Sequence, residues 1–199
     1  MYAILDIEAT GGKVGEESII EIAIYKFDGR EIVDQFISLV NPNRKIDQYV
    51  QKLTNITDKM VLTAPKFQEV AKRIVEITDD CTLVGHNVMF DYRMLKQEFE
   101  RLGYNYDKEW IDTFEYSEKL LPDLPSYSLG KLCESLGIVV TDRHRASGDA
   151  RATVALFKIL LDKDINKVIT KKTGLKQPKK VNSKYSKLLE GLPNTIGVF

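Results

Sequence analysis

The chain has 199 residues, 43% of them hydrophobic, which is enough for one globular core and hardly for two. Its 29 basic and 29 acidic side chains give a formal net charge of zero, which excludes a histone-like protein that coats polyanions and an acidic disordered chain. No apolar run approaches the roughly 18 residues of a membrane span, and acids near the start argue against a signal peptide. The two cysteines, Cys81 and Cys133, form no C-x-x-C pattern, so we expect a cytoplasmic protein with reduced thiols and no membrane partner.

The periodicity of the apolar residues predicts alternating strands and helices. Three strands come first, over residues 2–7, 19–27 and 31–40, and the turn dipeptide Asp28-Gly29 joins the last two. The elements expected next are a helix after Pro65, a strand over 82–85, a helix over 90–102 and a strand over 110–112. Three helices follow, over residues 113–120, 128–136 and 149–161. This order predicts an α/β fold in which a five-stranded mixed sheet has helices on both faces and an antiparallel hairpin at one edge.

Beyond about residue 164 the composition changes. Nine lysines and one acid lie between Lys163 and Lys187, whereas the first 162 residues carry a formal charge of −7. Lysines with few apolar anchors are typical of a linker, and these lysines either contact phosphates or only keep the segment solvated. We therefore expect a folded domain over residues 1–164, a linker over 165–190 and the start of another domain over 191–199. The chain would then be a fragment of a longer protein.

Asp6 and Glu8 lie two residues apart in the first strand, so their side chains point to the same face of the sheet. Two acids at the end of a buried strand are costly unless a cation lies between them. A pair of this kind is a weak signal when it stands alone, because most such pairs in proteins are solvated surface acids.

Two further segments place acids at the ends of strands or helices. Asp91 follows the fourth strand at the carboxyl edge of the sheet, and Asp149 opens the last long helix with His144 in the loop before it. Each has a structural alternative, since acids stabilise the first turn of a helix and loop histidines are commonly solvated. The combination of all three segments favours a site in which their carboxylates meet.

These segments resemble the three motifs of the DEDD exonuclease superfamily. The resemblance rests on Asp6-Ile7-Glu8-Ala9-Thr10-Gly11, on His86-Asn87 followed by Phe90-Asp91, and on His144 five residues before Asp149. The histidine spacing is that of the DEDDh branch, which includes the proofreading epsilon subunit of bacterial DNA polymerase III, and Arg145 argues against the tyrosine branch. Further family-like segments are Leu53-Thr54-Asn55-Ile56-Thr57 with Ala64-Pro65, and Tyr127-Ser128-Leu129. The resemblance spans residues 2–162, and Ala9 is a mild departure where the family often has Thr.

The resemblance implies a ribonuclease H-like fold and a 3′→5′ exonuclease that uses two Mg²⁺ or Mn²⁺ ions to release nucleoside 5′-monophosphates. It places Asp6 between the two ions. Glu8 and Asp149 would hold the ion on the side of the attacking water, Asp91 would assist, and His144 would be the general base. Carboxylates are the hard oxygen ligands that these ions prefer, whereas two histidines and two scattered cysteines would make a poor zinc site.

The same resemblance suggests substrate contacts. Residues beside Glu8 and Asp91 would lie near the terminal nucleotide, which makes candidates of Ile7, Thr10, Gly11, Asn87 and Phe90. Another group either wedges against the last base or only packs between helices, namely Leu53, Ile56 and Met60.

The end of the chain bears on the choice of substrate. Residues 192–199, LPNTIGVF, resemble the opening strand of a GIY-YIG nuclease domain, which favours single-stranded or frayed DNA 3′ ends as the substrate. A 3′→5′ exoribonuclease of the RNase T or oligoribonuclease type and a non-catalytic nucleic-acid-binding module are the alternatives. The catalytic residues do not separate DNA from RNA, because that discrimination depends on contacts to the 2′-hydroxyl. The sequence leaves open a polymerase partner and the choice between a role in proofreading and one in repair.

Overall fold

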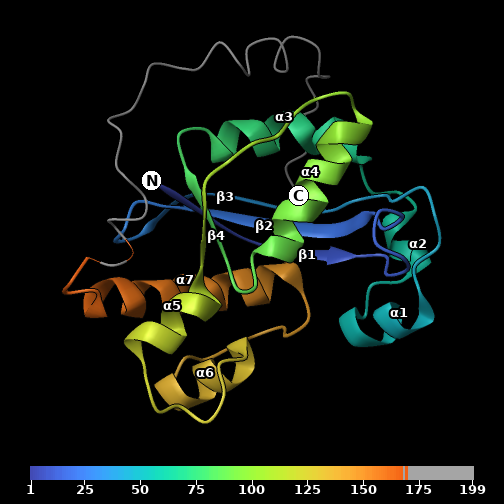
Figure 1. Ribbon diagram of the computed structural model, residues 1–199. Coiled ribbons are helices and arrows are strands. Elements are labelled where there is room, and N and C mark those ends of the chain that lie inside the picture. Colours follow the sequence, from blue (N-terminus) through green and yellow to red (C-terminus); the bar gives the residue numbers. More distant parts are fainter. Residues whose placement is uncertain (168, 170–199) are drawn as a thin grey trace.

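Residues 1–167 and 169 are described by the computed structural model, and they form one sheet with helices on both faces (Figure 1). The GIY-YIG-like segment and all of the expected linker beyond residue 169 lie outside the described residues. None of the described helices is long and apolar enough to cross a membrane.

The sheet has five strands in the order β3-β2-β1-β4-β5. The strands are β1 (Tyr2–Ala9), β2 (Ile19–Phe27), β3 (Ile32–Leu39), β4 (Thr82–Gly85) and β5 (Trp110–Asp112). The first three pair antiparallel, whereas β4 and β5 add to β1 in parallel. The predicted mixed sheet with a hairpin on one edge is therefore confirmed.

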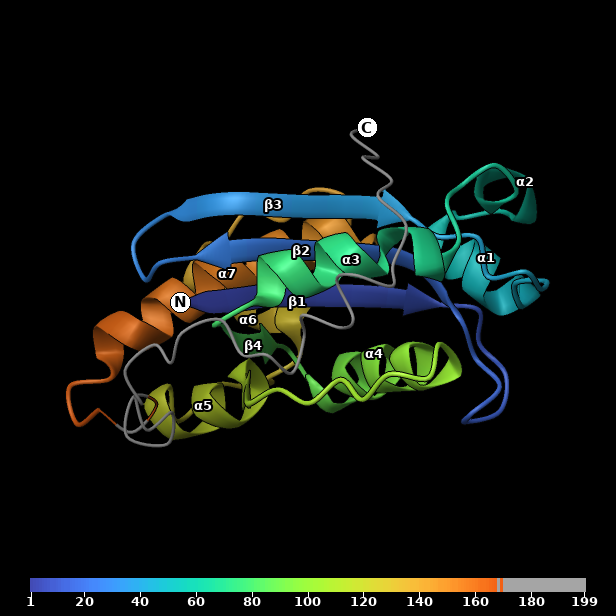
Figure 2. The same ribbon diagram turned by 90° about the horizontal axis from the view of Figure 1, so that it is seen from above.

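Seven helices are present among the described residues. They are α1 (Gln48–Thr54), α2 (Asp58–Val61), α3 (Phe67–Thr78), α4 (Met89–Arg101), α5 (Thr113–Leu120), α6 (Leu129–Leu136) and α7 (Ala146–Lys163). Figure 1 shows α3 and α4 on one side of the sheet and α5, α6 and α7 on the other. The sequence did not resolve α1 and α2, which lie beyond the end of β1 (Figure 2).

Alternation along β1 decides which face each of its side chains meets. Ala3, Leu5 and Ile7 belong to the apolar cluster under α3 and α4, whereas Ile4 belongs to the cluster under α5 and α7. Because side chains alternate along a strand, Asp6 and Glu8 share the face of Ile4. The two acids therefore face the layer that contains α7.

The end of β1 extends past its parallel neighbour. Its pairing with β4 covers Tyr2 to Ile4, and β4 ends at Gly85, from which the chain turns directly into α4. A Cβ atom at Gly85 would lie 3.2 Å from the backbone Cα of Val88, so this turn is too tight for a side chain. The start of α4 is thus held beside the unpaired edge of β1, where the acids lie.

The last helix starts earlier than predicted, and a residue beyond it still packs on the domain. Helix α7 begins at Ala146, three residues before Asp149, so Asp149 lies within its first turn and a half. Beyond α7, Ile169 is fully buried in the apolar cluster under that helix, although it follows the expected domain end at residue 164.

Candidate active site

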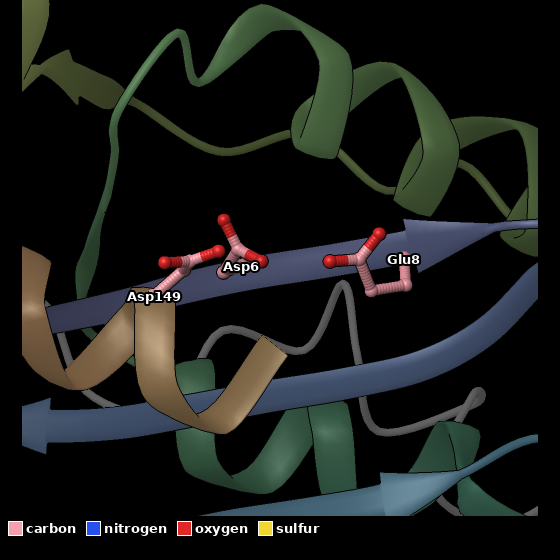
Figure 3. Close-up of side chains that lie close together, drawn as sticks. All are labelled: Asp6, Glu8 and Asp149. Atoms are coloured by element: carbon pink, nitrogen blue, oxygen red, sulfur yellow. The ribbon is translucent and has the colours of Figure 1, made fainter. Parts of the chain in front are cut away.

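Three carboxylates meet at the carboxyl end of β1. Asp6 and Glu8 come from β1, and Asp149 comes from α7 (Figure 3). One carboxylate oxygen of each residue lies within 4.8 Å of the corresponding oxygens of the other two. The side chains are partly buried. The structure therefore brings together acids that are separated by more than 140 positions along the chain.

Asp91 borders this cluster from the first turn of α4. Its side chain is 4% exposed, and the nearby backbone of Ile7 lowers the pKa of its carboxyl against the larger effect of burial. The carboxyl group of Asp91 therefore lies close to the unpaired edge of β1. Asp91 also gives the strongest of the charge interactions acting on Asp6, so it belongs to the same electrostatic unit.

Burial raises the pKa of all four acids, and repulsion from neighbouring carboxylates raises those of Asp6, Glu8 and Asp91 further. The pKa values of Asp6 and Asp91 lie well above the usual range, first because of burial and then because of neighbouring carboxylates. Burial, with the charges of Asp149 and Glu21, raises the pKa of Glu8 to about 8. The pKa of Asp149 is also raised by burial, although a hydrogen bond from the backbone of His144 opposes the shift. The cluster therefore holds protons at pH values where isolated carboxyls are charged.

The loop before α7 is fastened to the same cluster. The backbone N–H of His144 donates to Oδ2 of Asp149 at 3.0 Å, and His144 adopts a left-handed φ of 60°. A Cβ atom at Gly148 would collide with the backbone carbonyls of Thr141 and Asp142, so the loop packs directly against the helix. This contact holds the partly buried His144 next to Asp149.

A fifth acid, Glu21, was missed by the sequence analysis. Glu21 lies directly opposite Glu8 in the β1–β2 register and is 2% exposed. Its carboxylate accepts from Arg145 at 2.6 Å and from the backbone N–H of Ala146 at 2.8 Å, and the latter bond caps the start of α7. One charged residue inside the apolar run Ile19–Ile24 was the available signal, because such a charge must be paired.

His86 supports the turn after β4. Its Nδ1 atom lies 3.0 Å from the hydroxyl of Thr113, and its Nε2 atom donates to the carbonyl of Tyr127 at 2.9 Å. Burial lowers the pKa of His86. This histidine therefore joins the start of α5 and the loop before α6 to the turn that presents Asp91.

The residues predicted to contact the substrate fall into two groups, those with buried side chains and those with exposed side chains. The side chains of Ile7, Thr10 and Ile56 are 4%, 1% and 0% exposed, so they can act only through the backbone or by packing. Thr10 accepts from the backbone N–H of Ser18 at 3.1 Å, and Ile56 packs in a small cluster with Ile20, Ile46 and Val61. Side chains that do reach the surface are Leu53 (39% exposed), Met60 (38%), Phe90 (40%) and Asn87. Gly11 has a φ of +73°, and a Cβ atom there would lie 3.0 Å from Val50 of α1.

A family model described as Exonuclease matches residues 3–157. The chain belongs to the exonuclease family. The DNA polymerase III PolC-type protein of Caldanaerobacter subterraneus subsp. tengcongensis is 35% identical over 182 residues, and the 3′-5′ exonuclease DinG of Staphylococcus aureus is 36% identical over 163 residues. These matches cover 92% and 81% of this chain, which spans 13% and 18% of the two relatives.

Solved structures agree with this family assignment. Exonuclease X in complex with 5′ overhanging duplex DNA is 27% identical, with a TM-score of 0.66 over 82% of this chain and 93% of that one. E. coli Exonuclease I in complex with a dT13 oligonucleotide is 18% identical, with a TM-score of 0.73 over 83% and 42% of the two chains. The nuclease domain of 3′hExo, a DEDDh family member bound to rAMP, is 20% identical, with a TM-score of 0.72 over 82% and 92%. The expected ribonuclease H-like fold is confirmed.

The raised pKa of Glu8 predicts that the protein in chelator loses stability as the pH rises. The carboxyl has a pKa of 4.5 when free and about 8 in the folded chain, so the folded state binds the extra proton between these values. The stabilisation is complete below pH 4.5 and is lost by about pH 8. Thermal unfolding midpoints measured from about pH 5 to 8 should therefore fall. Glu8→Gln should flatten this fall, whereas the control variant Glu16→Gln, in the exposed β1–β2 loop, should not. Identical curves of midpoint against pH for the wild type and both variants would show that Glu8 is not the source of the fall.

The Glu21–Arg145 pair predicts a non-additive response to substitution. Arg145→Met leaves the buried Glu21 without its partner and should cost about 3 kcal/mol of unfolding free energy. Glu21→Met combined with Arg145→Met removes both charges and should recover most of that loss. Urea unfolding of the wild type, both single variants and the double variant measures this coupling. Losses that simply add would show that the pair contributes no specific stabilisation.

Proposed function

We propose that this domain is a metal-dependent 3′→5′ exonuclease that releases nucleoside 5′-monophosphates from DNA ends. The observation that carries the proposal is the meeting of Asp6, Glu8 and Asp149 within 4.8 Å, with Asp91 at their border. Membership of the exonuclease family supports it, as does similarity to a relative named as a 3′-5′ exonuclease. This chain spans only a small share of the length of those relatives, so their similarity does not by itself assign substrates or partners to it. Its substrates and partners are therefore proposed here as well.

The donor set of the cluster fits divalent metal ions. Its ligand atoms are carboxylate oxygens, which suit Mg²⁺ and Mn²⁺. Burial and, after it, mutual repulsion raise the pKa values of Asp6 and Glu8, and cations would relieve that repulsion. Asp6, Glu8 and Asp149 would hold two ions, with Asp91 assisting. Bound divalent ions supply activation of water and stabilisation of the leaving oxygen in phosphodiester hydrolysis.

The protein's own residues would position and move the proton. An imidazole can accept a proton near neutral pH, and we assign this role to His144. The backbone hydrogen bond from His144 to Asp149 fixes the loop that carries the imidazole. The ion pair between Arg145 and Glu21 fixes the next residue, so the loop is held at the base itself and at the residue that follows it.

We favour single-stranded or frayed DNA 3′ ends as the substrate. Exonuclease X and Exonuclease I are described with DNA, while 3′hExo is described with rAMP, so RNA remains the alternative outcome of the test. A non-catalytic module is disfavoured because each of the five catalytic positions, Asp6, Glu8, Asp91, His144 and Asp149, carries a chemically competent side chain. We assign the exonuclease to residues 1–164, with residues 165–190 as a linker and 191–199 as the start of a further domain. The two free, buried cysteines are consistent with a reducing, cytoplasmic location.

Asp6→Asn should abolish the nuclease while the fold persists. The substitution keeps the shape of the side chain and removes the charge that would lie between the two ions. Matched 5′-labelled DNA and RNA strands are incubated with Mg²⁺, with Mn²⁺ or with chelator. We expect a metal-dependent ladder that shortens from the 3′ end, faster on DNA and lost in the variant. An unchanged ladder in a folded Asp6→Asn protein would remove Asp6 from the site.

His144→Ala should lower the rate by roughly 10²–10⁴-fold, the usual contribution of a general acid or base. The variant should also lose the part of the pH–rate profile that the imidazole produces. Single-turnover rates between about pH 6 and 8.5 measure both effects. A wild-type rate that is constant over this interval would count against His144 as the base.

A further inference from the structure

Arg143 lies in the loop before α7, next to His144, and its side chain is exposed. Its guanidinium group rests on Gly130, in the first turn of α6. A Cβ atom at Gly130 would lie 2.6 Å from Cζ and 2.7 Å from Nη2 of Arg143. Because Gly130 has no side chain, α6 leaves a space at this position that the guanidinium fills, and we call this space the seat of Arg143.

Arg143 lies close to the carboxylate cluster but forms no ion pair with the acids described there. Its charge lowers the pKa of Asp149, against the burial that raises it, so the group lies within electrostatic range of the carboxylates. Among the described residues no hydrogen bond or ion pair joins Arg143 to an acid. Arg145, two residues later, is instead bound to Glu21.

The contact with α6 gives the arginine no electrostatic advantage. A helix N-terminus carries a partial positive charge, so the guanidinium gains nothing electrostatically from the start of α6. An exposed arginine that is held by packing keeps its hydrogen-bond donors for another molecule. The planar fork of a guanidinium matches the oxygens of a phosphate.

We propose that Arg143 binds a backbone phosphate of the nucleic-acid strand whose 3′ end lies at the carboxylate cluster, other than the phosphate that is cleaved. The inference rests on the proposed function and deepens it. A guanidinium anchored on α6, outside the three converging carboxylates, serves to hold the strand rather than to act on the scissile bond. Because phosphates are the same in every nucleotide, this contact is independent of sequence.

The test compares Arg143→Met with Gly130→Ala on a 5′-labelled oligothymidylate. Arg143→Met should raise KM about tenfold and leave kcat within about threefold, because the contact holds the strand before and during the reaction. It should also reduce the salt dependence of kcat/KM by a slope of about 0.7, the value for one lost phosphate contact on a single strand. Arg143→Lys keeps the charge without the fork and should fall between Met and wild type.

Gly130→Ala tests the seat without removing the arginine. The added methyl group displaces the flexible end of Arg143, while Ala is favourable within a helix, so the fold should be as stable as in the wild type. Its KM should rise as in Arg143→Met, and the double variant should be no worse than Arg143→Met alone. Arg30→Met, in the exposed β2–β3 turn, is the matched control and should leave KM and the salt slope unchanged.

The outcomes separate this inference from the proposed function. An active wild type with an unchanged KM in Arg143→Met, or a fall in kcat at constant KM, would overturn the inference and leave the nuclease in place. A wild type that shortens neither DNA nor RNA would overturn the proposed function. Fluorescence anisotropy of the labelled oligonucleotide in Ca²⁺ would then decide the inference by itself, since weaker binding by Arg143→Met supports it and equal binding refutes it.

Discussion

Repulsion among carboxylates that are crowded into a desolvated corner of the sheet is the constraint on which this structure depends. Asp6 and Glu8 share a face because strand side chains alternate, and α7 brings Asp149 to that face. Raised pKa values record the cost of this arrangement in the metal-free chain. A fold that concentrates such a cost in one place needs other interactions that prevent the acids from moving apart.

Those interactions are mostly backbone hydrogen bonds and one ion pair. The backbone of His144 holds Asp149, and Arg145 with Ala146 holds Glu21. The first bond fastens the loop before α7 to that helix, and the others fasten the start of α7 to β2. The acids are thus fixed by groups whose positions follow from the sheet and from the start of α7. This is the preorganisation that a site for divalent cations requires.

Periodicity and spacing were sufficient for the sheet, because buried strands carry long apolar runs and the hairpin has its own turn dipeptide. The four acids and His144 were found because the acids end strands or open helices and because the three segments together resemble the motifs of the DEDD exonuclease superfamily. Helices α1 and α2 were not resolved, since they have seven and four residues and show too few apolar repeats for a helical period. Glu21 was missed, and His86 was named only as part of a motif without its supporting role. The reason is that their partners lie more than 25 residues away, which no local pattern encodes.

The two arginines that flank His144 illustrate how one short loop can serve both the fold and the substrate. Arg145 forms an ion pair with Glu21, the fifth acid, which lies opposite Glu8, and its charge offsets part of the repulsion that Glu21 adds to the cluster. Arg143 faces outward on a seat provided by Gly130, where its charge offsets part of the negative potential that a nucleic-acid strand would meet. The order Arg-His-Arg therefore places the proposed base between a residue that fixes the loop and a residue that holds the strand. A change at Arg145 removes the ion pair that fixes the loop carrying His144, whereas a change at Arg143 leaves that pair intact. The two arginines therefore differ in the effect of their loss, which falls on stability for Arg145 and on strand binding for Arg143.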